Sequence, residues 1–301
     1  MIYNNALEAI GSTPLVRLDK IVNKYNLKGE IYAKIEYYSP GLSKKDRIAK
    51  YIIEKAISEN KLKKGQTVIE QTSGNTGIGL ALVCAYYGYP FVAVMSKGNS
   101  VERVKMIEAF GGKVELVEQD GNHEGVSKKD MELVEKRFNE LADELNAFKV
   151  NQFNNEDNAW AHYYTTGNEI LKDLKDVDVF VDYVGTGGSF VGVSKRLKED
   201  HNCLCFKVMP DKENHSIQGG GYFKSIPFEV SGLSDGDIIV SSEEAIEGMN
   251  ELSSLEGLYG GISSGANLKG AVKVLRDNPG KKVVFLLNDV GLKYLSVFSD
   301  Y

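Results

Sequence analysis

The chain repeatedly alternates a short apolar run, a loop rich in glycine, serine and threonine, and a run with helical spacing. Three such loops stand out, at residues 72–77 (TSGNTG), 185–189 (GTGGS) and 261–266 (GISSGA). Strands that alternate with helices at this spacing are typical of parallel sheets in α/β proteins. In parallel sheets these loops lie at the carboxyl ends of strands, where ligands bind, and each following helix offers unpaired amides to an anion. The sequence therefore predicts an α/β protein with several anion-binding loops.

Other segments extend the same alternation. We expect a strand at residues 31–38, a long helix that ends near residue 146 and a last strand at residues 281–289. The end of the long helix makes residue 150 the expected joint between two domains.

Two adjacent lysines lie in the segment at residues 39–56 (SPGLSKKDRIAKYIIEKA), at the start of a predicted helix that Ser43 can cap. Lys44 shares a mostly polar stripe of this helix, whereas Lys45 shares an apolar stripe. The apolar stripe consists of Ile48, Ala49, Ile52 and Ala56. Helical spacing therefore predicts that Lys44 faces water and that Lys45 points inward. A solvated basic turn is the alternative, because lysines are usually exposed.

Composition argues against several classes of partner. The 301 residues carry a formal net charge of −6 and no basic block, so nucleic acid and anionic membranes are unexpected partners. No apolar run approaches the roughly 20 residues of a membrane span, and the first residues do not resemble a signal peptide. Cys84, Cys203 and Cys205 lack CxxC spacing, so we expect reduced cysteines in a cytoplasmic protein. The four histidines show no metal-ligand spacing, and we expect no metal site.

The loop at residues 185–189 does not fit a dinucleotide site. A G-x-G-x-x-G pattern that begins at Gly185 would need a glycine where Phe190 stands, which disfavours an NAD-dependent oxidoreductase. A compact loop of Gly, Thr and Ser suits a single phosphate better. A tight turn without a ligand is the alternative for any one loop, but three loops and an inward lysine together favour a binding site.

These segments together resemble a known family. SPGLSKKDR is similar to the N-P-G-G-S-V-K-D-R segment of cysteine synthases and cystathionine β-synthases, pyridoxal phosphate enzymes of the tryptophan-synthase-β type. EQTSGNTGIGLA resembles the family's substrate loop, VGTGGSFVGV its phosphate loop and EGLYGGISSGAN the loop beside the pyridine nitrogen. The likeness runs in order from about residue 8 to residue 296. It implies fold-type II, with two domains that are each a mostly parallel twisted sheet flanked by helices and with the cofactor in the cleft between them.

The resemblance also implies how the chain divides. A smaller, mobile domain would span residues 35–150 and carry the lysine and the substrate-carboxylate loop. A larger domain would combine residues 1–34 and 151–301 and carry the phosphate loop and the pyridine loop. A homodimer is expected from the resemblance as well.

The matching residues take roles from the resemblance. Lys45 would form the Schiff base with pyridoxal 5′-phosphate and then take the Cα proton of the substrate. Asn75 would bond the 3′ oxygen of the cofactor, and Ser263 would face its pyridine nitrogen. The cofactor phosphate would be held by Gly185, Thr186, Gly187, Gly188 and Ser189. The substrate would be bound by Thr72, Ser73, Gly74, Thr76, Gln152 and Gly219. The threonines and serine of the first loop have a simpler alternative as helix caps, and Gln152 as an ordinary polar loop residue.

The implied reaction follows from the neutral hydroxyl of Ser263. Unlike a carboxylate, it does not hold the pyridine nitrogen protonated, which favours β-elimination over transamination. We expect β-replacement or β-elimination on a serine- or cysteine-type amino acid through an aminoacrylate intermediate. Cysteine synthesis from O-acetylserine and sulfide is the leading reaction. The alternatives are a cysteine lyase that releases hydrogen sulfide and forms serine or lanthionine, cystathionine β-synthase, and a silent binding subunit, which an intact Lys45 disfavours.

One region departs from the family pattern and leaves open which group leaves and which nucleophile arrives. After MPD the chain is short and passes directly to HSIQGGGY, where Gly219 and Tyr222 match a segment that overlies the active site. Asp235 and Asp237 follow this segment. A carboxylate there could activate water or steer a thiol, or both residues could simply form a turn before a strand.

Overall fold

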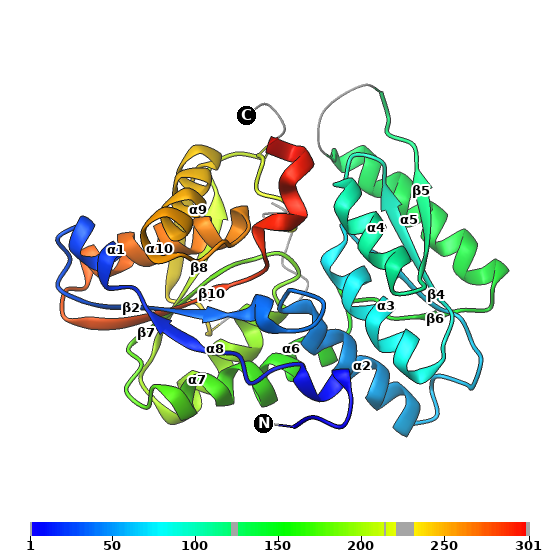
Figure 1. Ribbon diagram of the computed structural model, residues 1–301, viewed down its shortest axis with the longest axis horizontal. Helices are drawn as coiled ribbons and strands as arrows, with labels where there is room; N and C mark the ends of the chain where they lie inside the picture. The colour runs from blue at the N-terminus through cyan, green and yellow to red at the C-terminus, as the bar shows by residue number, and fades with distance from the viewer. Residues whose placement is uncertain (1, 122–125, 214, 221–231, 299–301) are drawn as a thin grey trace.

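The computed structural model describes residues 2–121, 126–213, 215–220 and 232–298. Its strands form one six-stranded and one four-stranded sheet, which lie side by side with helices packed on both (Figure 1). The predicted α/β class with mostly parallel sheets is confirmed. Tyr222 lies outside the described residues.

The six-stranded sheet has the order β1-β2-β10-β7-β8-β9, and its neighbouring strands are parallel except for β1 and β2. Alternate residues of β10 face opposite sides: Val283 and Phe285 pack in the core cluster that includes residues of α9 and α10, whereas Val284 and Leu286 pack in the cluster that includes residues of α8. A strand buried on both faces is typical of a parallel sheet. The strands are β1 (Leu15–Arg17), β2 (Gly29–Ile35), β7 (Val179–Tyr183), β8 (Leu204–Pro210), β9 (Gly236–Val240) and β10 (Lys281–Leu287).

The four-stranded sheet has the order β5-β4-β3-β6, and all its neighbours are parallel. One face packs against residues of α2, α3 and α4, and the other against Val134, Phe138 and Ala142 of α5. The strands are β3 (Val68–Gln71), β4 (Phe91–Ser96), β5 (Lys113–Val117) and β6 (Phe148–Lys149). Because β6 still pairs with β3, the chain leaves this sheet just before residue 150, close to the expected joint. The exact domain bounds stay a prediction.

The helices connect the strands in the expected alternation. Around the six-stranded sheet lie α1 (Asp19–Lys24), α6 (Asp157–His162), α7 (Asn168–Asp173), α8 (Gly188–Asp200), α9 (Ser242–Glu256) and α10 (Ile262–Asp277). Around the four-stranded sheet lie α2 (Lys45–Ser58), α3 (Asn75–Tyr87), α4 (Val101–Ala109) and α5 (Lys128–Glu144). Short 3-10 helices occupy Ala6–Ala9, Glu36–Tyr38 and Gly291–Phe298, and one π-helical segment, Tyr163–Gly167, joins α6 to α7.

The strand predicted at residues 31–38 is wrong at its carboxyl end. The strand β2 stops at Ile35, and Glu36–Tyr38 form a 3-10 helix. Glu36 is fully buried there and accepts hydrogen bonds from Arg47 and Thr13, so tertiary contacts override the alternating pattern.

Asp235 and Asp237 lie at the end of the six-stranded sheet opposite the glycine loops. The backbone N–H of Asp235 donates to the carbonyl of Cys205 at 2.8 Å, near the amino ends of β8 and β9. Its carboxylate pairs with Lys198, and that of Asp237 pairs with Lys207. Asp235 therefore lies just before β9, as the turn interpretation predicted, whereas Asp237 lies within the strand.

Two further features concern ligands and membranes. Cys84, Cys203 and Cys205 are free and buried. Across the described ranges, no three His, Cys, Asp or Glu side chains come together as a metal-binding group, and no helix is both long and apolar enough to cross a bilayer.

Candidate active site

Two of the three glycine-rich loops meet beside the lysine segment, at the carboxyl end of β10. The N–H of Lys44 donates to the carbonyl of Asn288 at 2.9 Å. The N–H of Gly261 donates to the carbonyl of Asp289 at 3.0 Å, and the Asn75 amide donates to the Asp289 carboxylate at 2.7 Å. The loops at residues 72–77 and 261–266, which are distant in sequence, are thereby held next to the lysines.

The helices that follow the three loops begin with glycine N-caps. Gly74, Gly187 and Gly261 cap α3, α8 and α10 without a side-chain hydrogen bond. By contrast, α5 and α9 begin with complete capping boxes built on Ser127 and Ser241. Within the loops, the first-turn amides of Gly77 and Gly188 donate to Thr72 Oγ1 at 3.3 Å and to Thr186 Oγ1 at 3.4 Å. The other amides of these first turns can bind a phosphate or a carboxylate.

The prediction that Lys44 faces water is wrong. Its exposed fraction is 9%, and its Nζ donates to Ser189 Oγ at 2.8 Å and to Asp182 Oδ1 at 3.1 Å. Lys44 is the N-cap of helix α2 and has helical dihedral angles, so the phase itself holds. The stripe that it shares is buried despite its polar residues, since Arg47 and Ile48 are 2% and 0% exposed. Through Lys44, the lysine segment thus also contacts the remaining glycine-rich loop, at residues 185–189.

Lys45 is half-buried, and the residues of its predicted apolar stripe are buried. Burial, reinforced by the adjacent cation of Lys44, lowers the pKa of Lys45 to about 7, although the carboxylates of Asp182 and Glu70 oppose the shift. A large share of this amine is therefore unprotonated at neutral pH. Such an amine can act as a nucleophile and as a base.

The loop at residues 185–189 is packed tightly enough to require glycine. A Cβ at Gly188 would lie 2.0 Å from Asn158 Oδ1. The Asn158 amide in turn donates to Thr186 Oγ1 at 3.0 Å. Gly187 has a φ of 93°, in the left-handed region that favours glycine. Glycine is thus required in this loop both by the packing of Asn158 and by the backbone conformation.

Gly219 lies against the same loop. A Cβ on Gly185 would come within 2.4 Å of the Gly219 carbonyl oxygen. The Tyr183 hydroxyl also donates to the carbonyl of Ile217 at 3.2 Å. The stretch around Gly219 therefore crosses the carboxyl end of β7, beside the glycine loop.

Polar groups line the loop at residues 72–77. Thr72 Oγ1 accepts from the N–H groups of Gly74 and Gly77 at 2.9 and 3.3 Å, so the capping alternative describes this oxygen. Thr76 Oγ1 donates to Gln152 Oε1 at 2.6 Å. The structure therefore brings Thr76 and Gln152 together, although they are far apart in sequence.

A buried arginine supports this loop from behind. Arg103 Nη1 donates to the carbonyl of Ser73 at 3.0 Å, and a Cβ at Gly74 would lie 2.2 Å from Arg103 Cδ. Asn75 is held on both sides, because its Oδ1 also accepts from Lys293 Nζ at 2.8 Å. The loop is thus anchored to α4 and to the carboxyl-terminal segment.

Ser263 faces a buried amide. Asn288 Nδ2 donates to Ser263 Oγ at 3.1 Å, and Asn288 Oδ1 has no hydrogen-bond partner among the described residues. The Ser263 hydroxyl therefore accepts one bond and keeps its own hydrogen to donate. A neutral donor of this kind suits an unprotonated ring nitrogen.

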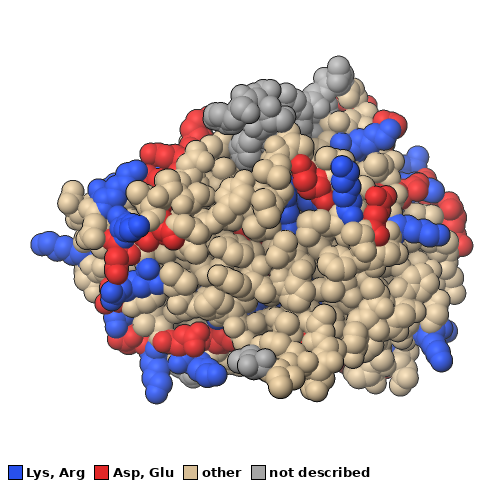
Figure 2. Space-filling model, in the orientation of Figure 1, with Lys and Arg blue, Asp and Glu red and all other residues tan. Residues whose placement is uncertain are grey.

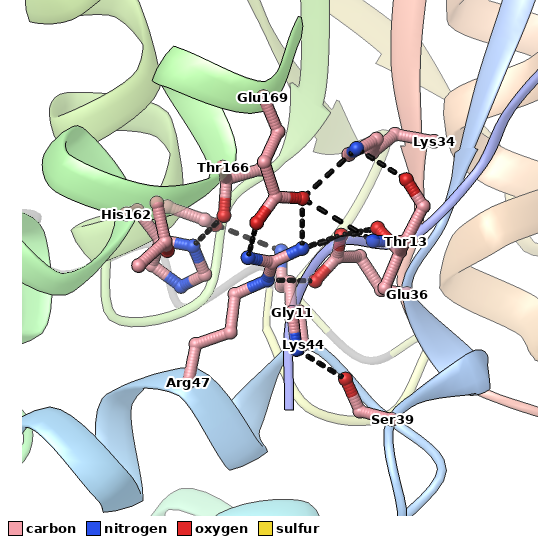
Figure 3. A network of polar contacts seen from close by, with 12 residues as sticks. Gly11, Thr13, Lys34, Glu36, Ser39, Lys44, Arg47, His162, Thr166 and Glu169 are labelled. Carbon is pink, nitrogen blue, oxygen red and sulfur yellow. Dashed lines mark hydrogen bonds and ion pairs between the residues drawn. The ribbon is translucent and has the colours of Figure 1, made fainter. Parts of the chain in front are cut away.

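A network of buried charges fixes the start of α2 (Figure 3). Arg47, two residues after Lys45, bonds Glu36 and Glu169, each at 2.6 Å, and Lys34 pairs with Glu169 at 2.9 Å. Burial opposes ionisation of Glu169, but Arg47 and Lys34 together lower its pKa to about 2. These ion pairs tie α2 to β2 and α7, and so hold Lys45 in place.

The sequence interpretation missed Asp182, Glu70, Asn158 and Arg103. Asp182 and Glu70 are fully buried in the apolar strands VFVDY and VIEQ. A charged residue inside such a strand is a signal of a specific partner, because an unpaired buried charge is strongly disfavoured. Asn158 and Arg103 carry no comparable signal, since both lie in helices with other polar residues.

The residues together fit pyridoxal phosphate. The glycine loop at residues 185–189 can hold its phosphate, the weakly basic amine of Lys45 its aldehyde, and the Ser263 hydroxyl its ring nitrogen. The chemistry of each group matches the donor set that surrounds it.

Comparison with known proteins agrees with this fit. The model of the family described as pyridoxal-phosphate dependent enzyme matches residues 6–289. A cysteine synthase from Staphylococcus aureus is 36% identical over 97% of this chain and 96% of its own length. Two solved structures each have a TM-score of 0.91. One is a hydrogen sulfide-producing enzyme from Fusobacterium nucleatum, 40% identical and covering 98% of this chain and 100% of its own. The other is a cysteine synthase from Entamoeba histolytica, which is 34% identical and covers 100% of this chain and 92% of its own.

Proposed function

The chain belongs to the pyridoxal-phosphate dependent enzyme family, and from this premise we propose that it synthesises cysteine from O-acetylserine and sulfide. The general reaction is replacement of the β-substituent of an amino acid. The observation that carries the proposal is the meeting of all three glycine-rich loops at the Lys44–Lys45 segment. The match to cysteine synthases over nearly the full length of both chains supports the choice of reaction.

Lys45 is the residue to which we assign the chemistry. Bound pyridoxal phosphate supplies an electron-withdrawing ring that makes the Cα proton of an amino acid acidic. Lys45 Nζ would hold the cofactor in the resting enzyme and would then take this proton. A pKa of about 7 suits both tasks, because the amine is neutral often enough to accept a proton and basic enough to return it.

The first loop orients the substrate. Its carboxylate would lie at the amino end of α3, near Thr72, Ser73, Gly74, Thr76 and Gln152. The Thr76–Gln152 hydrogen bond fixes both side chains before the substrate arrives, which lowers the entropic cost of binding. Asn75 and Ser263 would bond the 3′ oxygen and the ring nitrogen of the cofactor, and Gly219 would border the substrate beside the phosphate loop.

A second reaction is release of hydrogen sulfide from L-cysteine. The likeness to the hydrogen sulfide-producing enzyme from Fusobacterium nucleatum favours it, since that chain is covered completely at 40% identity. The same residues would serve, because expulsion of a thiol and addition of a thiol at Cβ are the two directions of one chemistry.

We also propose a cytoplasmic homodimer. Tyr38 and Tyr164 are 63% and 53% exposed, and Tyr164 stacks on Trp160 and Tyr51. Figure 2 shows few charged side chains over the lower middle of the molecule, where α2 and α6 lie in the same view (Figure 1). An exposed aromatic patch of this kind suits a protein interface. The three free cysteines suit a reducing compartment.

To test the proposed reaction, purified protein is incubated in parallel with two sets of substrates. One set is O-acetylserine with sulfide, and the other is L-cysteine alone, with products identified by mass spectrometry. Cysteine formation in the first set supports the proposal. Rapid sulfide release in the second set, with negligible cysteine synthesis, would replace it by the lyase reaction.

A variant pair tests the role of Lys45. We expect Lys45→Ala to lose the visible absorbance of the bound cofactor and the activity, while Lys64→Ala, an exposed lysine, keeps both. A colourless wild-type protein that does not bind pyridoxal phosphate would refute the proposed function.

A further inference from the structure

Lys44 is a buried cation to which the proposed chemistry assigns no part. Its Nζ contacts Asp182 and Ser189, and its exposed fraction is only 9%. The family segment that this part of the chain resembles has valine at the same position. A lysine that replaces an apolar residue in a buried place needs a partner that offsets its desolvation.

The loop at residues 185–189 has no cation of its own, since it consists of Gly, Thr and Ser. Behind it lies the fully buried carboxylate of Asp182, which accepts from the Ser189 hydroxyl and from Asn267 Nδ2 at 3.2 Å. A phosphate dianion in the loop would be repelled by this carboxylate. Lys44 contacts both Asp182 and Ser189, so its charge can offset that repulsion.

We propose that Lys44 is a direct ligand of the cofactor phosphate and that Asp182 positions it. The inference rests on the proposed function, which assigns the loop at residues 185–189 to that phosphate. An ammonium group has three N–H donors. One donor can serve both oxygens of Asp182, at 3.1 and 3.2 Å, and a second serves Ser189 at 2.8 Å. The third is left for a phosphate oxygen.

The geometry also keeps Lys44 apart from the role of its neighbour. Its Nζ is held by Asp182, so Lys44 does not compete with Lys45 as a nucleophile. The same fixed cation helps to keep the amine of Lys45 neutral, because it lowers the pKa of that amine. The two adjacent lysines therefore have separate roles: Lys44 binds the phosphate of the cofactor, and Lys45 binds its aldehyde.

The test compares two ligands that differ only in the phosphate. Full-length protein stripped of cofactor is titrated with pyridoxal phosphate and with pyridoxal, for the wild type and for Lys44→Met. We expect Lys44→Met to raise the Kd for pyridoxal phosphate about ten- to hundredfold, the range for loss of a hydrogen bond to a charged group. The Kd for pyridoxal should rise much less, because pyridoxal senses only the effect of Lys44 on the pKa of Lys45, which both ligands share. Equal weakening of both ligands, or no weakening of pyridoxal phosphate, would overturn the inference.

A double variant separates phosphate binding from simple neutralisation of Asp182. Lys44→Met with Asp182→Asn removes both charges and leaves no unpaired carboxylate, so it also serves if Lys44→Met alone folds poorly. Weak pyridoxal phosphate binding by the double variant supports the inference, and recovery of wild-type affinity contradicts it. The exposed variant Lys64→Met is the matched control. A wild type that binds neither ligand would refute the proposed function itself, whereas the other negative results refute this inference alone.

Discussion

Replacement of Glu169 by glutamine is the most quantitative test of the buried charge network in Figure 3. Glu169 accepts bonds from both Arg47 and Lys34, and its side chain is 19% exposed. Glu169→Gln keeps the shape and removes the charge. The start of α2 would then lose one of the two carboxylates that hold Arg47.

The magnitude follows from the pKa of Glu169, which is lowered from 4.5 to about 2. A pKa difference of 1 corresponds to about 1.36 kcal/mol, so the ionised carboxylate stabilises the fold by roughly 3 kcal/mol at neutral pH. Because this pKa is depressed on folding, the stabilisation is complete above the unfolded value near 4.5. It is lost as the pH falls toward 2.

The assay is urea unfolding of wild type and variant, followed by circular dichroism at several values between about pH 7 and pH 3. Other carboxylates also titrate in this range, so the informative quantity is the difference in unfolding free energy between the two proteins. We expect a difference of about 3 kcal/mol at pH 7 that shrinks steadily below about pH 4.5. The exposed variant Glu132→Gln should leave the unfolding free energy unchanged.

One outcome would refute the reasoning. If the two proteins have the same unfolding free energy at pH 7, or if their difference is the same at about pH 3 as at pH 7, ionisation of Glu169 does not stabilise the fold.

Three further predictions concern the site. The rate at which cofactor-free protein binds pyridoxal phosphate, measured by stopped-flow absorbance, should rise as the pH increases through about 7, because the neutral amine of Lys45 is the reactive form. A rise that comes only near about pH 10 would contradict this. Gly188→Ala places a Cβ 2.0 Å from Asn158 Oδ1, so its affinity for pyridoxal phosphate, measured by titration, should fall at least tenfold; an unchanged affinity would exclude the loop as the phosphate site. Gln152→Ala should raise the KM for the amino acid about tenfold and leave the cofactor spectrum unchanged; an altered spectrum with normal KM would assign Gln152 to the cofactor instead.

Much of the fold was predictable because local patterns carry it. The alternation of apolar runs, glycine-rich loops and helical spacing predicted mostly parallel sheets, and the strands of both sheets are mostly parallel. The apolar stripe of α2 was predicted correctly, since Ile48, Ala49, Ile52 and Ala56 are all buried. The end of β2 was not, because Glu36 leaves the strand to meet Arg47, a partner eleven residues away.

The candidate site was predictable to a lesser degree. Motif resemblance selected Lys45 and the three loops, and the structure brings the loops together beside its neighbour Lys44 and the residues that follow β10. The motif resemblance did not indicate which neighbours hold these residues in place. Arg103 beneath the first loop and Asn158 beneath the phosphate loop make contacts that depend on which helices pack behind these loops.

Sequence by itself thus determined the class of fold and the family, because these depend on order and spacing along the chain; the role of Lys45 at the cofactor stays a prediction. Only the tertiary structure decided the position of Lys44. Its mostly polar stripe had assigned it to water, but that stripe is buried, because Arg47 pairs there with Glu36 and Glu169. The partner of Lys44 is Asp182, 138 residues away, and a pairing of that length is set by which strand ends meet. Lys44 is therefore buried beside the loop at residues 185–189, where it contacts Asp182 and Ser189.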